Sequence, residues 1–88
     1  MSVFYVYILE TISKNGKKMY YTGYTNDLLR RIKEHKNNRG AKFCKGKKLE
    51  IKYFESYTDI KQAMKRELEI KSFTHKEKEE LITQFTQR

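Results

Sequence analysis

The sequence predicts a small α/β (α+β) domain in which helices cover a short sheet. Two β-branched and aromatic runs flank a turn signal near the N-terminus, and later segments repeat their apolar residues at helical spacing. The chain has 88 residues, of which 38% are hydrophobic, so one domain over residues 1–88 is expected. The predicted element order is β-β-α-β-α-α, with the helices packed on the sheet.

The first two elements are expected to form a hairpin. Val3–Leu9 (VFYVYIL) has no polar alternation, which predicts a strand buried on both faces. Ser13–Gly16 carries a turn signal, and Met19–Thr25 has the composition of a second strand. Leu49–Tyr53 (LEIKY) alternates, which predicts a third, half-exposed strand.

The first helix is expected to follow the hairpin directly. Asn26 suits an N-cap, and Asp27 would lie in the first turn, where the helix dipole favours a negative charge. The helix should end near Asn37, and a basic loop over residues 38–48 follows it. The apolar stripe of this helix comprises Leu28, Leu29 and Ile32.

Two more helices are expected in the C-terminal third. Asp59 can cap a helix from Ile60 to about Lys71. Thr74 and Glu77 form the pattern of a capping box, which opens a last helix. On the helix that begins at Ile60, the apolar stripe comprises Ile60, Ala63, Met64, Leu68 and Ile70.

Positive charge is concentrated in the middle of the chain. The formal net charge is +9, yet residues 14–48 carry +10 and the remainder carries −1. A localised basic surface is typical of proteins that bind a phosphate-rich partner, usually nucleic acid. The alternative is a basic chain kept soluble by its charge, and the segregation makes this the weaker interpretation.

The cysteine content and the N-terminal run exclude other classes of protein. Cys44 is the only cysteine, which excludes an intramolecular disulfide framework and a cysteine zinc cluster. Val3–Leu9 is too short for the core of a secretory signal or for a membrane span. A cytoplasmic protein without membrane attachment is therefore expected.

Glu67 is a carboxylate in the middle of an apolar helical stripe. Burying it is costly unless it is paired or binds a cation. One interpretation is an i,i+4 ion pair with Lys71 at the edge of the stripe. The other is a ligand for Mg²⁺, which binds few protein oxygens and keeps several waters. The pattern leaves both open.

Arg31 and His35 lie four residues apart and so share one face of the first helix. An arginine there could clamp a phosphate and a histidine could bind it or move protons, although a basic face with a packed histidine is the alternative. Five of the seven tyrosines fall on the first two strands, where strand preference alone can explain them. Gly23 on the second strand indicates a close backbone approach or a bend. Together these groups suit phosphodiester hydrolysis, in which a metal and an arginine stabilise charge on phosphorus.

The same residues resemble the motifs of the GIY-YIG nucleases. Tyr5-Val6-Tyr7 stands where that family has GIY, and Tyr21-Thr22-Gly23 stands where it has YIG. Both motif tyrosines and the glycine are present, whereas Tyr5, Val6 and Thr22 replace a glycine and two isoleucines. The resemblance covers about residues 3 to 82 and is strongest to the short stand-alone, URI-like members.

The resemblance implies a three-stranded antiparallel sheet flanked by helices, and cleavage of DNA with one Mg²⁺ or Mn²⁺ ion. It assigns Glu67 to the metal and Arg31 to the phosphate. Tyr7 would act as the general base or position it, Tyr21 would orient water or contact the phosphate, and His35 would assist proton movement. A tyrosine base needs a nearby cation, because the pKa of free tyrosine is about 10.

The basic loop is expected to bind DNA phosphates without reading sequence. The candidate DNA-binding residues are Gly23, Arg39, Lys42, Lys45, Lys47 and Lys48. The expected function is a metal-dependent DNA endonuclease, with DNA repair or recombination as its candidate setting, acting as a monomer with a protein partner for target choice. The alternatives are a non-catalytic nucleic-acid-binding module of the same fold and a protein-interaction domain with a tyrosine-rich surface.

Overall fold

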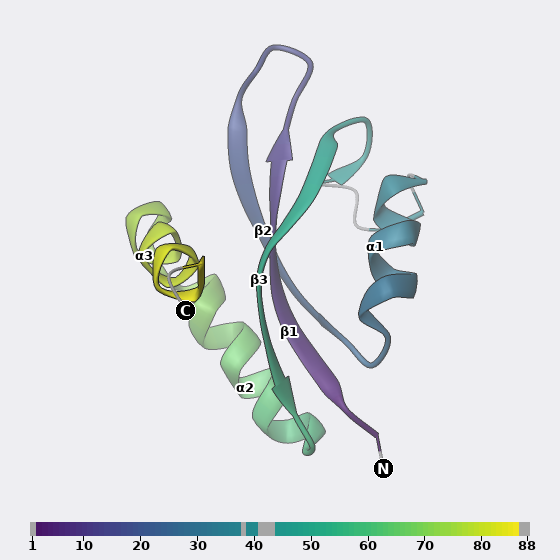
Figure 1. Cartoon of the computed structure of the whole chain (residues 1–88), viewed down its shortest axis with the longest axis vertical. Helices are drawn as coiled ribbons and strands as arrows, with labels where there is room; N and C mark the ends of the chain where they lie inside the picture. The colour runs from purple at the N-terminus through teal and green to yellow at the C-terminus, as the bar shows by residue number, and fades with distance from the viewer. Residues whose placement is uncertain (1, 38, 41–43, 87–88) are drawn as a thin grey trace.

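The computed structural model describes residues 2–37, 39–40 and 44–86. Within them, three strands and three helices follow each other in the predicted order (Figure 1). They are β1 (Phe4–Ile12), β2 (Lys18–Thr25), α1 (Leu28–Lys36), β3 (Lys48–Tyr57), α2 (Ile60–Lys71) and α3 (His75–Thr86). The strands form one antiparallel sheet in the order β2-β1-β3, so the predicted fold class is confirmed.

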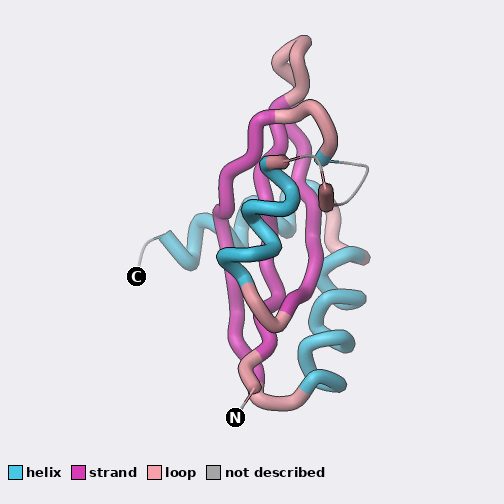
Figure 2. Tube along the Cα trace, turned by 90° about the vertical axis from the view of Figure 1, so that its right-hand side faces the viewer, coloured by secondary structure: helices cyan, strands magenta, loops and turns pink. Residues whose placement is uncertain are grey.

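The sheet separates the helices into two layers. α1 covers one face, and α2 and α3 lie on the other (Figures 1 and 2). Val6 and Ile8 of β1 pack toward α2 and α3, whereas Tyr7 and Leu9 pack toward α1. β1 is therefore a central strand with both faces covered, which explains its unbroken apolar run. No helix in the described part of the chain is long and apolar enough to cross a membrane.

The strands run beyond their predicted ends. The sequence pattern places the end of the first strand at Leu9, whereas β1 continues to Ile12, and β3 covers Lys48–Tyr57 rather than 49–53. Hydrogen bonding explains how polar residues extend β1, since the buried Thr11 hydroxyl donates to the Met19 carbonyl at 3.2 Å. The longer strands bring the β1–β2 turn close to the start of β3, because Ile12 pairs with Lys48.

Asp27, not Asn26, caps α1. Its carboxylate accepts a hydrogen bond from the Arg30 amide at 3.1 Å. The prediction at Asn26 was wrong by one residue because the Thr25 hydroxyl binds the Asp27 amide, at 3.1 Å, and holds Asp27 outside the helix. The other predicted caps are confirmed: the Asp59 carboxylate accepts from an amide of α2, and Thr74 and Glu77 form a reciprocal capping box.

α2 buries less of its apolar stripe than the pattern predicts. Ala63 and Ile70 are fully buried against the sheet, but Ile60, Met64 and Leu68 are exposed, Leu68 by 66%. The three exposed residues form an i,i+4 row on the flank of the helix, beside the line that contacts the strands. The predicted stripe is thus too wide, because the small sheet covers only a narrow strip of the helix surface.

Candidate active site

Tyr7 and His35 form a buried polar pair between the sheet and α1. The Tyr7 hydroxyl lies 3.0 Å from His35 Nε2, and each residue is 1% exposed. Strand alternation directs Tyr7 toward α1, and His35 lies in the last turn of that helix. The structure therefore gives His35 a specific polar partner in addition to the packed position that the sequence allowed.

Two glycines leave the space that this pair occupies. A Cβ built on Gly23 would lie 2.6 Å from the Tyr7 hydroxyl oxygen and 3.2 Å from the Tyr21 ring. A Cβ built on Gly40 would overlap the His35 imidazole. Gly23 faces Tyr7 directly in the β1–β2 register, so the close approach indicated by a strand glycine is here an approach to the Tyr7 side chain.

Tyr21 and Arg31 complete a cluster on the same face of the sheet. The Tyr21 ring centroid lies 5.4 Å from the imidazole of His35 and 6.4 Å from the ring of Tyr7. Arg31 lies one turn before His35, where its guanidinium pairs with Glu34 at 3.3 Å and is near enough to the Tyr7 hydroxyl to lower the pKa of that group. The Arg31 side chain keeps 32% of its surface exposed, so a ligand can reach the guanidinium from solvent.

Burial controls the titration of this cluster. It raises the pKa of Tyr7 to about 12, and the nearby Arg31 guanidinium opposes only part of that rise. Burial also lowers the pKa of His35, and the nearby positive charge of Arg31 lowers it further. At neutral pH the cluster therefore holds a neutral phenol, a neutral imidazole and a guanidinium cation. A neutral imidazole has one nitrogen free of hydrogen, so Nε2 can accept the Tyr7 proton.

Glu67 belongs to α2, the helix across the sheet from α1 (Figure 1). Its side chain is 13% exposed, and its carboxylate lies 3.6 Å from the Lys71 ammonium one turn later. The structure thus contains the i,i+4 ion pair that was one of the two interpretations of the sequence. It brings together Tyr7, Tyr21, Arg31 and His35, and it places the helix that carries Glu67 on the opposite face.

The described residues contain no cluster of potential metal ligands. Over residues 2–37, 39–40 and 44–86, no group of three or more His, Cys, Asp or Glu side chains could hold a metal ion. A Mg²⁺ ion can nevertheless bind through one or two carboxylates, with waters and substrate phosphates as its other ligands. Glu67, whose side chain is 13% exposed, stays a predicted ligand of this kind.

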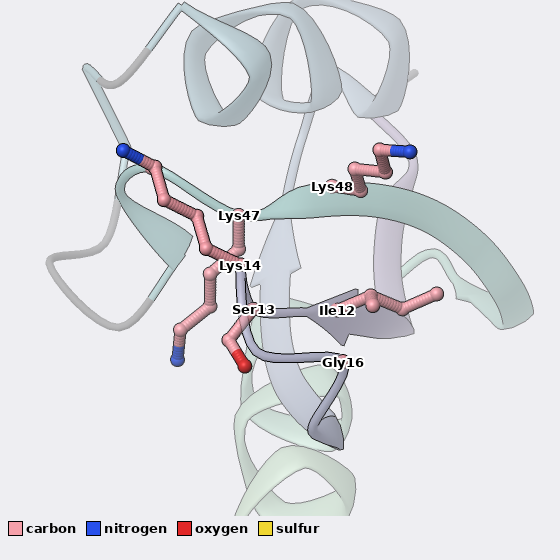
Figure 3. A pocket seen from close by; sticks show the side chains of 7 residues that line it. Ile12, Ser13, Lys14, Gly16, Lys47 and Lys48 are labelled. Atoms are coloured by element: carbon pink, nitrogen blue, oxygen red, sulfur yellow. The ribbon is translucent and has the colours of Figure 1, made fainter.

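The candidate DNA-binding residues of the basic loop differ in their exposure and in the elements to which they belong. Arg39 and Lys45 are exposed, and Lys48 is the first residue of β3. Lys47 lines a notch together with Lys14 of the β1–β2 turn (Figure 3). Lys42 lies outside the described residues. DNA contacts by these residues and by Gly23 stay predictions.

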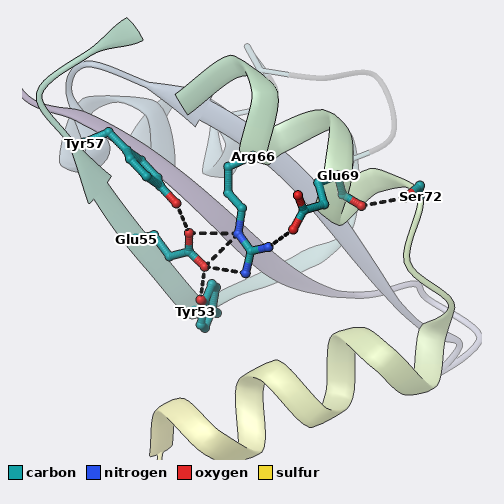
Figure 4. A network of polar contacts seen from close by, with 6 residues as sticks. All are labelled: Tyr53, Glu55, Tyr57, Arg66, Glu69 and Ser72. Atoms are coloured by element: carbon teal, nitrogen blue, oxygen red, sulfur yellow. Dashed lines mark hydrogen bonds and ion pairs between the residues drawn. The ribbon is translucent and has the colours of Figure 1, made fainter. Parts of the chain in front are cut away.

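A second arginine cluster, on the α2 face, has no signal in the sequence pattern (Figure 4). Arg66 binds both carboxylate oxygens of Glu55 on β3, at 3.0 and 3.1 Å, and also pairs with Glu69. Tyr53 and Tyr57 donate their hydroxyl hydrogens to Glu55. Burial alone would raise the pKa of Glu55, but the hydrogen bonds from Arg66 and the two tyrosines outweigh it and lower that pKa. The Arg66–Glu55 contact of this network links α2 to β3.

Known proteins resemble this chain over most of its length. A family model described as the GIY-YIG catalytic domain matches residues 3–80. A UPF0213 protein of Haloquadratum walsbyi is 39% identical over 83 residues, which cover 93% of this chain and 89% of that protein. A UPF0213 protein of Clostridium perfringens is 41% identical over 80 residues, which cover 90% and 82%.

A solved structure shares the fold. The solution NMR structure of a UPF0213 protein from Bacillus halodurans is 38% identical to this chain and has a TM-score of 0.54. The match covers 92% of this chain and 83% of that one. The names of these relatives state a family and no reaction.

Proposed function

The chain belongs to the GIY-YIG family of nuclease-like catalytic domains, and from this premise we propose that it is a metal-dependent endonuclease that hydrolyses phosphodiester bonds in DNA. One arrangement carries the proposal: a hydroxyl 3.0 Å from an imidazole, beside a partly exposed guanidinium. The charge of +10 over residues 14–48 supports a polyanionic substrate. DNA repair or recombination is the setting in which we expect such an activity.

Arg31 would hold the scissile phosphate. Its guanidinium stays charged at every functional pH, and its planar fork suits contact with two phosphate oxygens. Hydrolysis adds negative charge to those oxygens in the transition state, so a fixed cation stabilises the transition state more than the ground state. The pairing with Glu34 keeps the side chain oriented without closing it off from solvent.

Tyr7 and His35 would act as one proton acceptor. A phenol whose pKa is about 12 is not ionised at neutral pH and is a weak base alone. With His35 neutral, the Tyr7 oxygen can take a proton from the attacking water while its own proton passes to Nε2. The hydroxide so formed attacks phosphorus as the bond to the leaving oxygen breaks, and the leaving oxygen keeps the electron pair of that bond and takes a proton from solvent. Tyr21, which is less buried than Tyr7, would orient this water or contact the phosphate.

Glu67 would hold the single Mg²⁺ or Mn²⁺ ion. Its carboxylate oxygens are the hard ligands that these ions prefer, and its partner Lys71 has a flexible, half-exposed side chain that can move aside. When bound, the ion would supply Lewis-acid stabilisation of a phosphate oxygen.

Cleavage of supercoiled plasmid DNA tests these assignments. We expect Arg31→Ala to lower the rate about 100- to 1000-fold, as loss of one charge-stabilising donor does in other active sites. Arg30→Ala is the matched control, because Arg30 is the exposed neighbour of Arg31 on the same helix. Glu67→Gln and EDTA should each abolish cleavage. Equal rates for wild type, Arg31→Ala and Glu67→Gln, or full activity in EDTA, would contradict the proposal.

Nucleic-acid binding without cleavage is the second candidate function, and the position of Glu67 favours it. The carboxylate already forms an ion pair with Lys71, and α2 lies across the sheet from Arg31. A module of this kind would bind DNA with an affinity that falls as salt rises and does not depend on a metal. It would leave plasmid and branched DNA intact with either metal, so the same assay distinguishes the two functions.

A further inference from the structure

A basic notch lies where the β1–β2 turn meets the entry to β3 (Figure 3). Its volume is about 460 Å³. Ser13 and Lys14 line it from the turn, and Gly46, Lys47 and Lys48 line it from the segment that leads into β3. The charged side chains along this lining are all lysines.

The two walls of the notch are held in place by backbone structure. In the turn, the Ser13 amide donates to the Lys17 carbonyl at 3.0 Å, and Gly16 adopts a positive φ of 84° that a side chain would disfavour. On the other wall, the Lys47 amide donates to the Cys44 carbonyl at 3.3 Å, and Gly46 also has a positive φ, of 73°. The sheet register sets the two walls side by side, because Ile12 pairs with Lys48.

The lysines of the notch differ in direction. The side chains of Lys14 and Lys47 extend on the same side of the notch, whereas Lys48 points away from them (Figure 3). An anion with several oxygens can contact two ammonium groups that come from separate segments on one side of the notch.

The notch borders the α1 face of the sheet through Lys47, whose amide donates to the Cys44 carbonyl. Cys44 packs in the same buried cluster as Tyr7 and Leu9. Burial raises the pKa of the Cys44 thiol, and the positive charges of Lys47 and Arg31 both oppose that rise. Lys47 and Arg31 therefore lie near the same buried group, on the side of the sheet covered by α1.

We propose that this notch binds a second backbone phosphate of the DNA whose scissile phosphate lies at Arg31, with Lys14 and Lys47 as its ligands. The proposal rests on the function proposed above and adds to it a direction for the DNA, from the α1 face toward the β1–β2 turn. It also separates Lys47 from Lys48, which the sequence pattern treats alike, and it adds Lys14, which lies outside the basic loop.

The salt dependence of DNA binding tests the notch. The affinity of a labelled duplex is measured in EDTA, so that no cleavage occurs, over a series of salt concentrations. Each lost phosphate contact lowers the slope of log affinity against log salt by about 1, so Lys14→Gln/Lys47→Gln should lower it by about 2. The matched control is Lys17→Gln/Lys61→Gln, which removes two charges at exposed positions that do not line the notch, one of them in the same turn.

The outcomes separate the notch from the catalytic proposal. A control variant that keeps the wild-type slope while the notch variant loses about 2 supports the notch, even if the wild type cuts no DNA. Equal losses in both double variants, or a wild-type slope in Lys14→Gln/Lys47→Gln, would overturn the notch, even if the wild type cuts DNA efficiently. A wild type that binds no duplex at all would overturn both proposals.

Discussion

On the α2 face of the sheet, Arg66 binds a carboxylate that also accepts hydrogen bonds from two tyrosines, and on the α1 face Arg31 lies beside a tyrosine that is paired with a histidine. The two clusters use nearly the same side chains. They differ in how exposed the carboxylates are: the Glu55 side chain beside Arg66 is 19% exposed, whereas the Glu34 side chain that pairs with Arg31 is 38% exposed.

This difference separates a structural arginine from one that can bind a ligand. Arg66 is held between Glu55 and Glu69, so its charge and its donors are satisfied within the protein. Arg31 has a neutral phenol below it and a surface carboxylate beside it, so an incoming phosphate can gain a full charge-assisted contact. The tyrosines of the two clusters differ in the same way. The Tyr53 hydroxyl donates to Glu55, which is already bound to Arg66. The Tyr7 hydroxyl lies beside His35, which can take its proton.

The largest difference between the two faces of the sheet is expected in the rate of DNA cleavage after one tyrosine hydroxyl is removed from each face. Tyr7→Phe removes the oxygen that would receive the proton of water, and we expect cleavage to slow about 100-fold or more. Tyr53→Phe keeps its ring contact with Phe85 and lies on the other face, so its cleavage rate should match the wild type. Single-turnover cleavage measures both variants. A comparable fall in Tyr53→Phe would show that hydroxyl loss acts through folding and not through the proposed proton path.

The next effect concerns stability, where the change on the α2 face is expected to matter more than the change on the α1 face. Arg66→Met leaves the Glu55 carboxylate with only its tyrosine partners, and we expect the free energy of unfolding to fall by roughly 2 kcal/mol. Arg31→Met breaks a partly exposed pair and should cost less than about 0.5 kcal/mol. Urea unfolding with an unchanged m-value measures both. If Arg31→Met were the more destabilising variant, the assignment of the two arginines would have to be exchanged.

The sequence predicts most of this fold because its signals are local. The unbroken apolar run marks the central strand, and the spacing of apolar residues with Asp59 as cap gives the bounds of α2 as the structure has them. The end of β1 was missed because hydrogen bonds to the partner strand, not apolar side chains, carry the strand through Thr11. Asn26 and Asp27 are adjacent cap candidates, and the Thr25 hydroxyl decides between them.

The candidate site could be predicted only in part. Helical spacing puts Arg31 and His35 on one face, and strand alternation puts Tyr7 on one side of β1, but local pattern does not pair them. The same limit applies to Glu67. Its position in the stripe predicts that its side chain points toward the sheet, but it does not predict which face of the sheet α2 covers. The pairing of Glu55 with Arg66 also depends on how two distant elements cross, so no periodicity marks it.

The smallest expected effect is a difference in the pH range over which each cluster stabilises the fold. Burial lowers the pKa of His35 in the folded protein, so the unfolded chain binds a proton first as the pH falls below about 6.5. Stability should therefore decline on acidification from pH 7 toward 5, and His35→Asn should flatten that decline. His75→Asn is the control, because His75 is exposed.

The α2 face should respond at lower pH. Burial opposes ionisation of Glu55, but the hydrogen bonds from Arg66 and the two tyrosines give it a lowered pKa, so its stabilisation is present above the ordinary carboxylate range and is lost as the pH falls through the folded-state value. Glu55→Gln should leave the slope between pH 7 and 5 unchanged and reduce the loss of stability below about pH 4.5. Urea unfolding across this range measures both slopes. If Glu55→Gln flattened the upper range, or His35→Asn the lower one, the two faces would not titrate as separate units, and the division between an open and a closed cluster would fail.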